Sequence, residues 1–178
     1  MESEIMIKEY DRTAAVAYAR KWAFSRNPLY YDFTGQGGNC TNFVSQCVYA
    51  GCGQMNFTPI FGWYYISPED RAAAWTGVEF FYNFMTNNAN PEDPVGDGLG
   101  PFAREAGAGE LLPGDVIQLG REEGDFYHTL IVTGFSRRGY LVAAQSDNAL
   151  DRPLYTYSFR RIRFLHILGC RAGIPDDM

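Results

Sequence analysis

One segment of the chain combines a glycine-rich loop with a strongly patterned helix. Three glycines lie within residues 35–38, Asn39 follows at an N-cap position, and Gly51 stands where the helical pattern ends. Between them, cysteine, phenylalanine and valine side chains recur at helical spacing along one face. This pattern predicts an amphipathic helix with Cys40 in its first turn. Its apolar face must be covered, so the rest of the chain has to supply a layer against which it packs.

Other segments upstream and downstream of this helix carry weaker helical signals. Asp11 stands at an N-cap position before a predicted helix over residues 12–24. A capping box opens a predicted helix over residues 76–85. Residues 86–100 are rich in Asn, Pro, Asp and Gly and are expected to form a long surface loop. A short helix is expected over residues 102–106.

From residue 111 the pattern changes to that of β-strands. Strands are predicted over residues 115–119, 126–135, 140–145, 155–159 and 161–168. Arg160, Arg161 and Arg163 alternate with apolar residues near the last strand, which indicates the polar face of a strand rather than a phosphate-binding patch. Helices first and strands second favour an α+β fold, with one domain over residues 1–178 and an antiparallel sheet packed on the second helix.

Composition and charge exclude several classes of protein. Aromatic residues make up 16% of the chain, which argues against disorder. The formal net charge is −6 with no dense basic block, so we expect no nucleic-acid partner. No stretch approaches ~20 apolar residues, so we expect no membrane span. The N-terminus has no apolar core of a Sec signal peptide, which predicts a cytoplasmic protein unless another route exports it.

The four cysteines and two histidines do not form a metal-binding pattern. No pair has the C-x-x-C spacing of structural zinc sites or thioredoxin-like redox sites. The chain is also long and poor in cysteine for a disulfide framework. We therefore expect no metal and no cofactor.

Cys40 and His128 are the residues whose positions suggest nucleophilic catalysis. A thiolate is favoured at a helix N-terminus, where free N–H groups and the helix dipole stabilise the anion. His128 begins a strongly apolar strand after a polar loop, a suitable place for a general base. The alternatives are that Cys40 is a small core residue and His128 a structural histidine. His166, within an apolar strand, is expected to be structural.

A third residue should orient the imidazole through its other nitrogen. Gln145 ends the strand that follows His128, so the two are expected to be neighbours across the ladder. Asp147 is the second choice, and it carries a charge. For the oxyanion hole, the backbone N–H of Cys40 is available, and Gln36 in the preceding loop is the candidate for the second donor.

Several motifs carry a resemblance to a known family. Residues 37–51, GGNCTNFVSQCVYAG, closely resemble the GGDCTNFVSQ helix of the bacterial putative amidase-domain family. That family is similar to the NlpC-type and CHAP cell-wall hydrolases of the papain-like cysteine peptidase superfamily. Further matching motifs follow in the same order, namely Trp75-Thr76, LPGDVI at 112–117, FYHTLIVTG at 126–134 and RPL at 152–154. The likeness extends over residues 10–169.

The resemblance implies a papain-like or NlpC-type fold with Cys40 as nucleophile, His128 as base and a polar third residue. It also implies cleavage of an amide bond, with peptidoglycan peptide as the substrate. Two positions depart from the family pattern. Asn39 stands where these families usually have Asp, and Gln145 stands where the family often has a histidine or an acid.

The leading hypothesis is a cysteine amidase or peptidase that works through an acyl-enzyme intermediate. The alternative is an inactive or weakly active binding module of the same fold that holds a peptide or a glycan. Asn39 and the aromatic residues Trp63 and Trp75 are candidate binding residues for either function, with the aromatics lining a groove. A third hypothesis is a transferase that passes the acyl group to an amine. The sequence specifies no oligomeric state.

Overall fold

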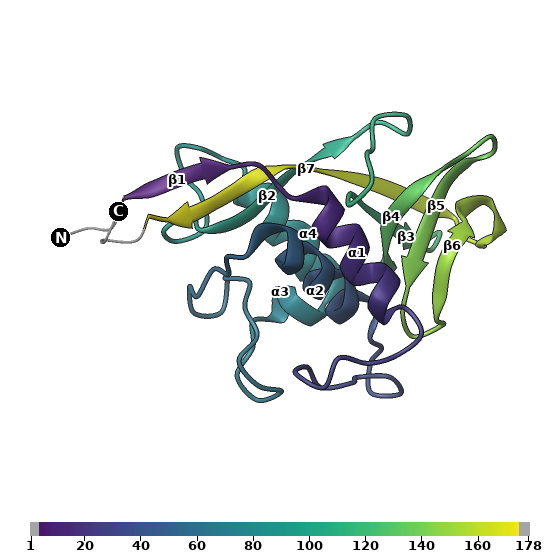
Figure 1. Ribbon diagram of the computed structural model, residues 1–178, viewed down its shortest axis with the longest axis horizontal. Coiled ribbons are helices and arrows are strands. Elements are labelled where there is room, and N and C mark those ends of the chain that lie inside the picture. Colours follow the sequence, from purple (N-terminus) through teal and green to yellow (C-terminus); the bar gives the residue numbers. More distant parts are fainter. Residues whose placement is uncertain (1–3, 175–178) are drawn as a thin grey trace.

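The computed structural model describes residues 4–174, and its elements form an α+β arrangement with an antiparallel sheet, as predicted (Figure 1). The elements in chain order are β1 (Ile5–Lys8), α1 (Arg12–Trp22), α2 (Cys40–Cys52), α3 (Ala73–Thr76), α4 (Val78–Asn87), β2 (Gly100–Ala106), β3 (Val116–Gly120), β4 (Phe126–Ser136), β5 (Gly139–Ala144), β6 (Ala149–Pro153), the 3-10 helix η1 (Leu154–Thr156) and β7 (Arg161–Gly173).

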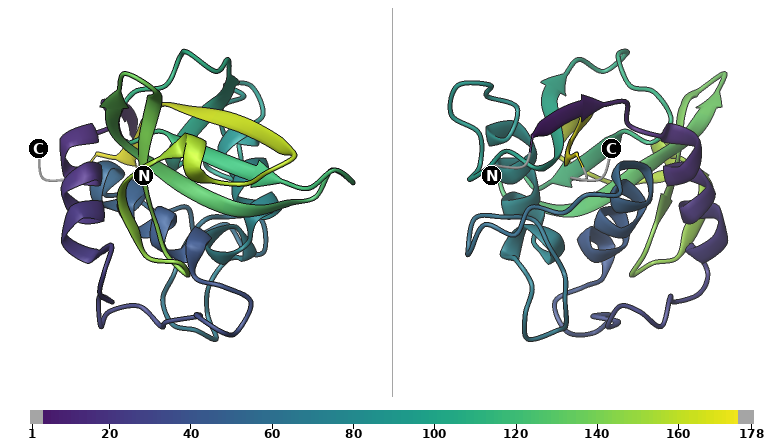
Figure 2. Two further views of the ribbon diagram at one scale, coloured as in Figure 1. Left: turned by 90° about the vertical axis from the view of Figure 1, so that its right-hand side faces the viewer. Right: turned by 60° about the vertical axis from the view of Figure 1, so that its left-hand side comes forward.

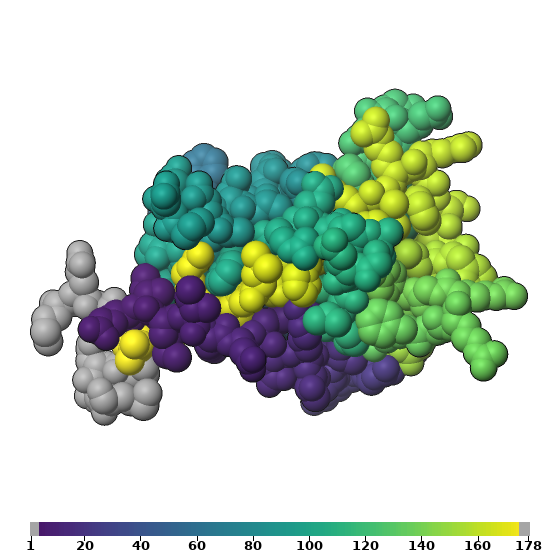
Figure 3. Space-filling model, turned by 90° about the horizontal axis from the view of Figure 1, so that it is seen from above, coloured from purple at the N-terminus to yellow at the C-terminus, as the bar shows by residue number. Residues whose placement is uncertain are grey.

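The sheet is assembled along β7, a strand of 13 residues. β3 pairs with residues 161–165 of β7, β2 with residues 164–171, and β1 with residues 170–173, all antiparallel. From β3 the sheet continues through β4 and β5 to β6. Seen from above, β7 (yellow) emerges between the purple N-terminal elements and the teal residues around β2 and β3 (Figure 3). Elements from both ends of the sequence therefore share one strand.

The helices lie on one face of the sheet and enclose the larger apolar core. α1 and α2 pack side by side, and α2 packs on β4 (Figures 1 and 2). Ile131, Ala143 and Leu165 face this core from three different strands. On the opposite face, Ile117 and Leu130 belong to a second core. Since the neighbouring residues Leu130 and Ile131 lie in different cores, β4 is covered by apolar side chains on both faces.

Both helices expected before residue 55 are confirmed. α1 begins after Asp11, whose side chain accepts a hydrogen bond from the backbone N–H of Ala14 (3.0 Å). α2 begins at Cys40, and it ends one residue beyond Gly51, with Gly53 in the left-handed conformation (φ +72°) as its C-cap. Gly51 has a different use, because a Cβ there would lie 2.5 Å from the ring of Tyr10. Glycine thus permits the close approach of α2 to the start of α1.

Residues 102–106, predicted as a short helix, lie in strand β2. The prediction is wrong because the segment pairs with residues 164–169 of β7, which lie 58 to 67 positions away in the sequence. β1 was not predicted for the same reason, since its partners are the last residues of β7. Strand pairing of this kind depends on neighbours that a local pattern does not contain.

The segment after β5 also differs from the prediction. The strand expected over residues 155–159 is replaced by β6 at residues 149–153 and the short 3-10 helix η1. Arg152 Nε donates to the hydroxyl of Thr156 (2.8 Å), and that hydroxyl donates to the carbonyl of Pro153 (2.7 Å). These two bonds close a turn where the sequence indicated extended backbone.

The capping box expected at residues 76–79 is not formed. Thr76 ends α3, and Gly77 precedes α4 without any side-chain cap. The hydroxyl of Thr76 instead accepts a hydrogen bond from Arg71 Nε (3.1 Å). The loop predicted to follow is confirmed between the end of α4 and the start of β2.

Arg163 does not lie on an exposed polar face of its strand, as the alternating pattern had predicted. Its residue surface is 9% exposed, and its Nε donates to Gln118 Oε1 (2.8 Å). The guanidinium lies 3.7 Å from the ring centre of Tyr82 and 3.8 Å from that of Phe126. Stacking between two rings and a buried amide partner keep this charge inside the protein.

The carboxylate of Asp115 is fully buried between three elements. It accepts hydrogen bonds from Arg12 (2.8 Å) at the start of α1 and from the backbone N–H of Leu112 (2.9 Å) before β3. It also bonds His166 Nδ1 (2.7 Å) and accepts from the backbone N–H of Ile167 (2.8 Å), both in β7. His166 is therefore part of a structural hydrogen-bond network.

Replacing this carboxylate should destabilise the whole fold. We expect Asp115→Asn to lower the free energy of unfolding by roughly 3 kcal/mol, because it leaves Arg12 and two backbone donors without their charged acceptor. Urea denaturation followed by tryptophan fluorescence measures the change. The matched control is Asp125→Asn, which removes an exposed carboxylate that pairs with Arg121 (2.7 Å) and should cost at most about 1 kcal/mol. Equal costs for the two variants would contradict the role given to Asp115.

Candidate active site

The glycine-rich loop leads directly into the first turn of α2. Gly37 and Gly38 have φ angles of +96° and +100°, a region that favours glycine. A Cβ on Gly38 would lie 3.4 Å from the hydroxyl of Ser146, so the loop passes close to the end of β5. Cys40 follows as the first residue of the helix and is 8% exposed. The thiol thus sits at the positive end of the helix, almost covered by its surroundings.

Asn39 ties the start of α2 to the segment after β5. Its backbone N–H donates to Ser146 Oγ (2.7 Å), and its side-chain Nδ2 donates to Gln145 Oε1 (2.6 Å). Its Oδ1 accepts from the backbone N–H of Phe33 (2.9 Å) and from Asn42 Nδ2 (2.9 Å). Asn39 occupies the N-cap position as predicted, but its side chain does not cap the helix. It instead holds the loop, the helix and the end of β5 together.

A pair of buried hydroxyls joins the start of α2 to the start of β4. Thr41 Oγ1 and Thr129 Oγ1 lie 2.8 Å apart, and Gln118 Nε2 also donates to Thr129 (3.3 Å). Cys40 Sγ lies 3.8 Å from Thr41 Oγ1. Thr129 directly follows His128, so this hydroxyl bridge brings the segments that carry the cysteine and the histidine together. Within residues 4–174, no hydrogen bond joins the thiol to the imidazole itself.

The ring of His128 is partly buried between two tyrosines. Its centre lies 6.4 Å from that of Tyr127, with nearly parallel planes, and 6.0 Å from that of Tyr157. Burial lowers the pKa of His128 below its ordinary value, the charge of Asp147 raises the pKa, and the charge of Arg152 lowers it. The net shift is downward, which favours the neutral imidazole. A neutral imidazole is the form that can accept a proton.

Gln145 makes its hydrogen bonds with the end of α1, the residues after it and the N-cap of α2, not with His128. Its Nε2 donates to the carbonyls of Trp22 (2.8 Å) and Ser25 (3.0 Å), and its Oε1 accepts from Asn39. These contacts give hydrogen-bond partners to both the nitrogen and the oxygen of the side-chain amide. Of the two candidates for the third residue, Asp147 is the one whose charge acts on the imidazole.

Gln36 lies in the exposed part of the loop before α2. Its Nε2 donates to the hydroxyl of Tyr31 (3.0 Å). That contact holds the side chain within its own loop. A role of Gln36 in an oxyanion hole stays a prediction.

Trp63 and Trp75 do not line a groove, which corrects the expectation from the sequence. Neither side chain has any exposed surface. The indole N–H of Trp63 donates to Ser45 Oγ (3.0 Å), and that of Trp75 donates to Asn42 Oδ1 (3.0 Å). Both tryptophans therefore hold α2 from behind as part of the core.

Sequence reasoning missed three residues whose hydrogen bonds join the elements of the site, namely Thr41, Thr129 and Ser146. The signal for Thr129 was available, because it is a polar side chain next to the apolar run Leu-Ile-Val of β4. A buried hydroxyl in such a place needs a partner, which here is Thr41. Ser146 gave no comparable signal, since serines in loops are usually solvated.

Metal-binding clusters and membrane-spanning helices are both absent from the described residues. Among residues 4–174, no group of three or more His, Cys, Asp or Glu side chains could hold a metal ion. None of the helices described in that range has the length and apolar character needed to cross a bilayer.

Comparisons with known proteins give a family match and one close relative. The model of a family described as "Putative amidase domain" matches residues 9–168. An uncharacterized protein of Bacillus subtilis (strain 168), YhbB, is 35% identical over 171 residues, which cover 90% of this chain and 51% of the relative. The chain thus spans about half the length of that relative. No solved structure matches the chain with significance.

The environment of His128 predicts how its pKa responds to two substitutions. Asp147→Asn should lower the pKa further, because it removes the negative charge that favours the imidazolium. Arg152→Gln should raise the pKa, because it removes a repelling positive charge. The chain has two histidines, so proton NMR titration of the ring signals in a Cys40→Ala background can follow each one separately.

The matched control for this titration is Glu92→Gln, which removes an exposed carboxylate from the loop after α4. It should leave the pKa of His128 unchanged. An Asp147→Asn variant that titrates like the parent protein would show that Asp147 does not act on the imidazole.

Proposed function

Because the chain belongs to the family of the putative amidase domain, we propose that it is a thiol-dependent hydrolase that cleaves an amide bond. The Sγ atom of Cys40 attacks the amide carbonyl while His128 takes the thiol proton. His128 then returns the proton to the leaving amine, and water hydrolyses the resulting acyl-enzyme. The reaction needs no redox partner, since one C–N bond breaks and one C–O bond forms overall.

The observation that carries this proposal is the hydroxyl bridge between Thr41 and Thr129. It joins the first turn of α2 to the start of β4, and these two segments hold the cysteine and the histidine. The free N–H groups of the helix start would stabilise both the thiolate and the oxyanion of the tetrahedral intermediate. Gln36 is the proposed second oxyanion donor.

Asp147 is the proposed third residue of the site. Its charge favours the protonated imidazole, which is the form that His128 takes after it accepts the thiol proton. Gln145 would act instead through Asn39, by holding the start of α2 in place. These separate roles for Asp147 and Gln145 replace the expectation that the glutamine itself orients the imidazole.

The proposed substrate is the peptide of peptidoglycan, and the proposed fold family is papain-like. Both rest on the likeness of the cysteine helix and the histidine strand to the NlpC-type and CHAP hydrolases. The binding-module alternative loses its main support, because Trp63 and Trp75 are core residues without exposed surface. The hydrolase is therefore the function that we propose.

Alkylation by iodoacetamide tests whether Cys40 is an activated thiol. At neutral pH, Cys40 should be labelled faster than Cys47, whose pKa is raised by complete burial and which serves as the internal control. His128→Ala should slow the labelling of Cys40, because the imidazole no longer accepts the thiol proton. Mass spectrometry of the digested protein locates the label. Equal labelling of Cys40 in the two proteins would argue against a Cys–His pair.

Turnover of soluble peptidoglycan fragments, followed as newly formed amino groups, tests the reaction. Cys40→Ala should reduce the rate by about 10³-fold or more, because it removes the nucleophile. His128→Ala should reduce it by about 10²- to 10⁴-fold, the usual contribution of a general base. Cys47→Ala is the matched control and should retain activity. A Cys40→Ala variant with normal turnover would refute the mechanism, and products formed with an added amine would identify a transferase.

A further inference from the structure

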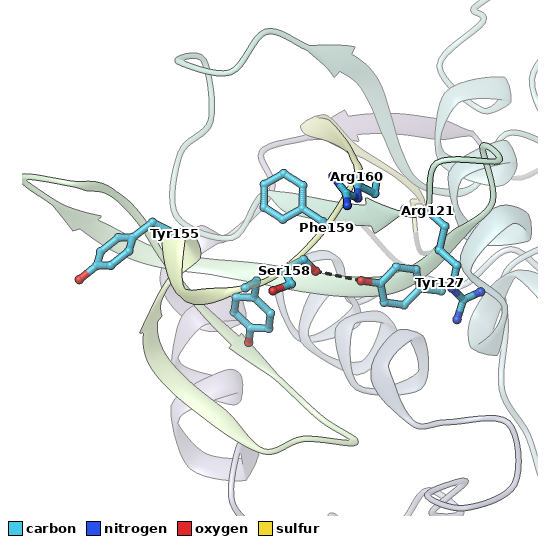
Figure 4. Close-up of a pocket in the computed structure, with 8 residues that line it drawn as sticks. Arg121, Tyr127, Tyr155, Ser158, Phe159 and Arg160 are labelled. Carbon is cyan, nitrogen blue, oxygen red and sulfur yellow. Dashed lines mark hydrogen bonds between the residues drawn. The ribbon is translucent and has the colours of Figure 1, made fainter.

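A pocket of about 550 Å³ lies at the start of β4, beside the segment that leads into β7. Its walls come from two places in the sequence, the β3–β4 connection and residues 155–160 (Figure 4). Figure 4 shows Phe159 and Arg160 side by side, with the hydroxyl of Tyr127 bonded to Ser158. That hydroxyl donates to the carbonyl of Ser158 (3.1 Å), which fixes one wall of the pocket to the other.

The pocket is adjacent to the imidazole of His128. Tyr127 and Tyr157 both line it, and the rings of these two tyrosines also flank the His128 ring at 6.4 and 6.0 Å. His128 itself does not line the pocket, so these two tyrosines are what connects the imidazole to it. Burial raises the pKa of Tyr157, so its hydroxyl stays protonated and adds no charge.

The lining of the pocket is positively charged, although the whole chain has a net charge of −6. It contains Arg121 and Arg160 and no acidic residue. Arg121 is paired with Asp125 (2.7 Å). Arg160 is exposed, and its guanidinium has no ion pair or hydrogen bond to any residue in the range 4–174.

The backbone of Arg160 is nevertheless fixed. Its N–H donates to the carbonyl of Gly120 (3.0 Å), which anchors the residue beside the end of β3. An exposed guanidinium that lines a pocket and lacks a partner, on a backbone that is itself held, is suited to bind a carboxylate through paired hydrogen bonds.

We propose that this pocket binds a carboxylate on the amine side of the scissile bond. The assignment to the amine side rests on the proposed function, because there His128 returns its proton to the leaving amine and the leaving part must lie on the side of His128. The carboxylate is either the free α-carboxylate of a C-terminal residue or an acidic side chain. Arg160 is the residue that would bind it.

Calorimetric titration with three dipeptides tests the proposal. Glycyl-glutamine carries only an α-carboxylate, glycyl-glutamate α-amide carries only a side-chain carboxylate, and glycyl-glutamine amide carries neither. The full chain with Cys40→Ala is used so that no probe is consumed. At low ionic strength at least one carboxylate probe should bind about tenfold or more tightly than the neutral amide. The stronger of the two identifies the source of the carboxylate.

Two charge-matched substitutions show whether the pocket is responsible. Adding Arg160→Gln should reduce the preference for the carboxylate probe to about threefold or less. Arg137→Gln, an equal loss of charge in the exposed β4–β5 turn, should leave the preference unchanged. Equal binding of all three probes, or equal effects of the two substitutions, would overturn the proposal.

This experiment is independent of the thiol chemistry. A carboxylate preference that depends on Arg160 supports the pocket even when Cys40 proves unreactive toward iodoacetamide, which would refute only the proposed hydrolysis. An activated Cys40 without any carboxylate preference would refute only the pocket.

Discussion

The buried carboxylate of Asp115 is the interaction on which the rest of the architecture depends. A charge without solvent must be neutralised and hydrogen-bonded, and here the partners come from the start of α1, the turn before β3 and the middle of β7. These elements cannot separate without exposing an unpaired charge. Since α1 packs on α2, the same constraint sets the position of the helix that begins with Cys40.

The candidate site is assembled from short polar contacts between elements that are distant in the sequence. Asn39 connects the helix start to the end of β5, and Thr41 connects it to β4. The apolar face of α2 provides the area of contact with the sheet, but the polar contacts at its first turn set its register. A thiol placed by such bonds keeps its position even where the surrounding loops are exposed.

Local signals were sufficient for α1, α2 and the strands from β3 to β5, because caps, periodicity and turns lie within those segments. They were insufficient for β2, because strands β3 to β6 separate it in the sequence from its pairing partner β7. Cys40 and His128 were chosen as candidates by position alone, and their roles stay a prediction. The buried position of Trp75 could not be predicted, since the sequence does not show that Asn42 accepts a hydrogen bond from its indole N–H. The sequence also does not show that the amide nitrogen of Gln145 donates to two backbone carbonyls.

The hydrogen bonds around Thr129 and Thr41 all run in the same donor-to-acceptor order. Arg163 donates to Gln118, and Gln118 donates to Thr129, which leaves the hydroxyl proton of Thr129 to point at Thr41 and that of Thr41 to point at the sulfur of Cys40. This is the order in which every hydroxyl proton has an acceptor. The sulfur thus stands at the end of a chain of aligned hydrogen bonds that starts at Arg163 on β7 and passes through β3 and β4 to the tip of α2.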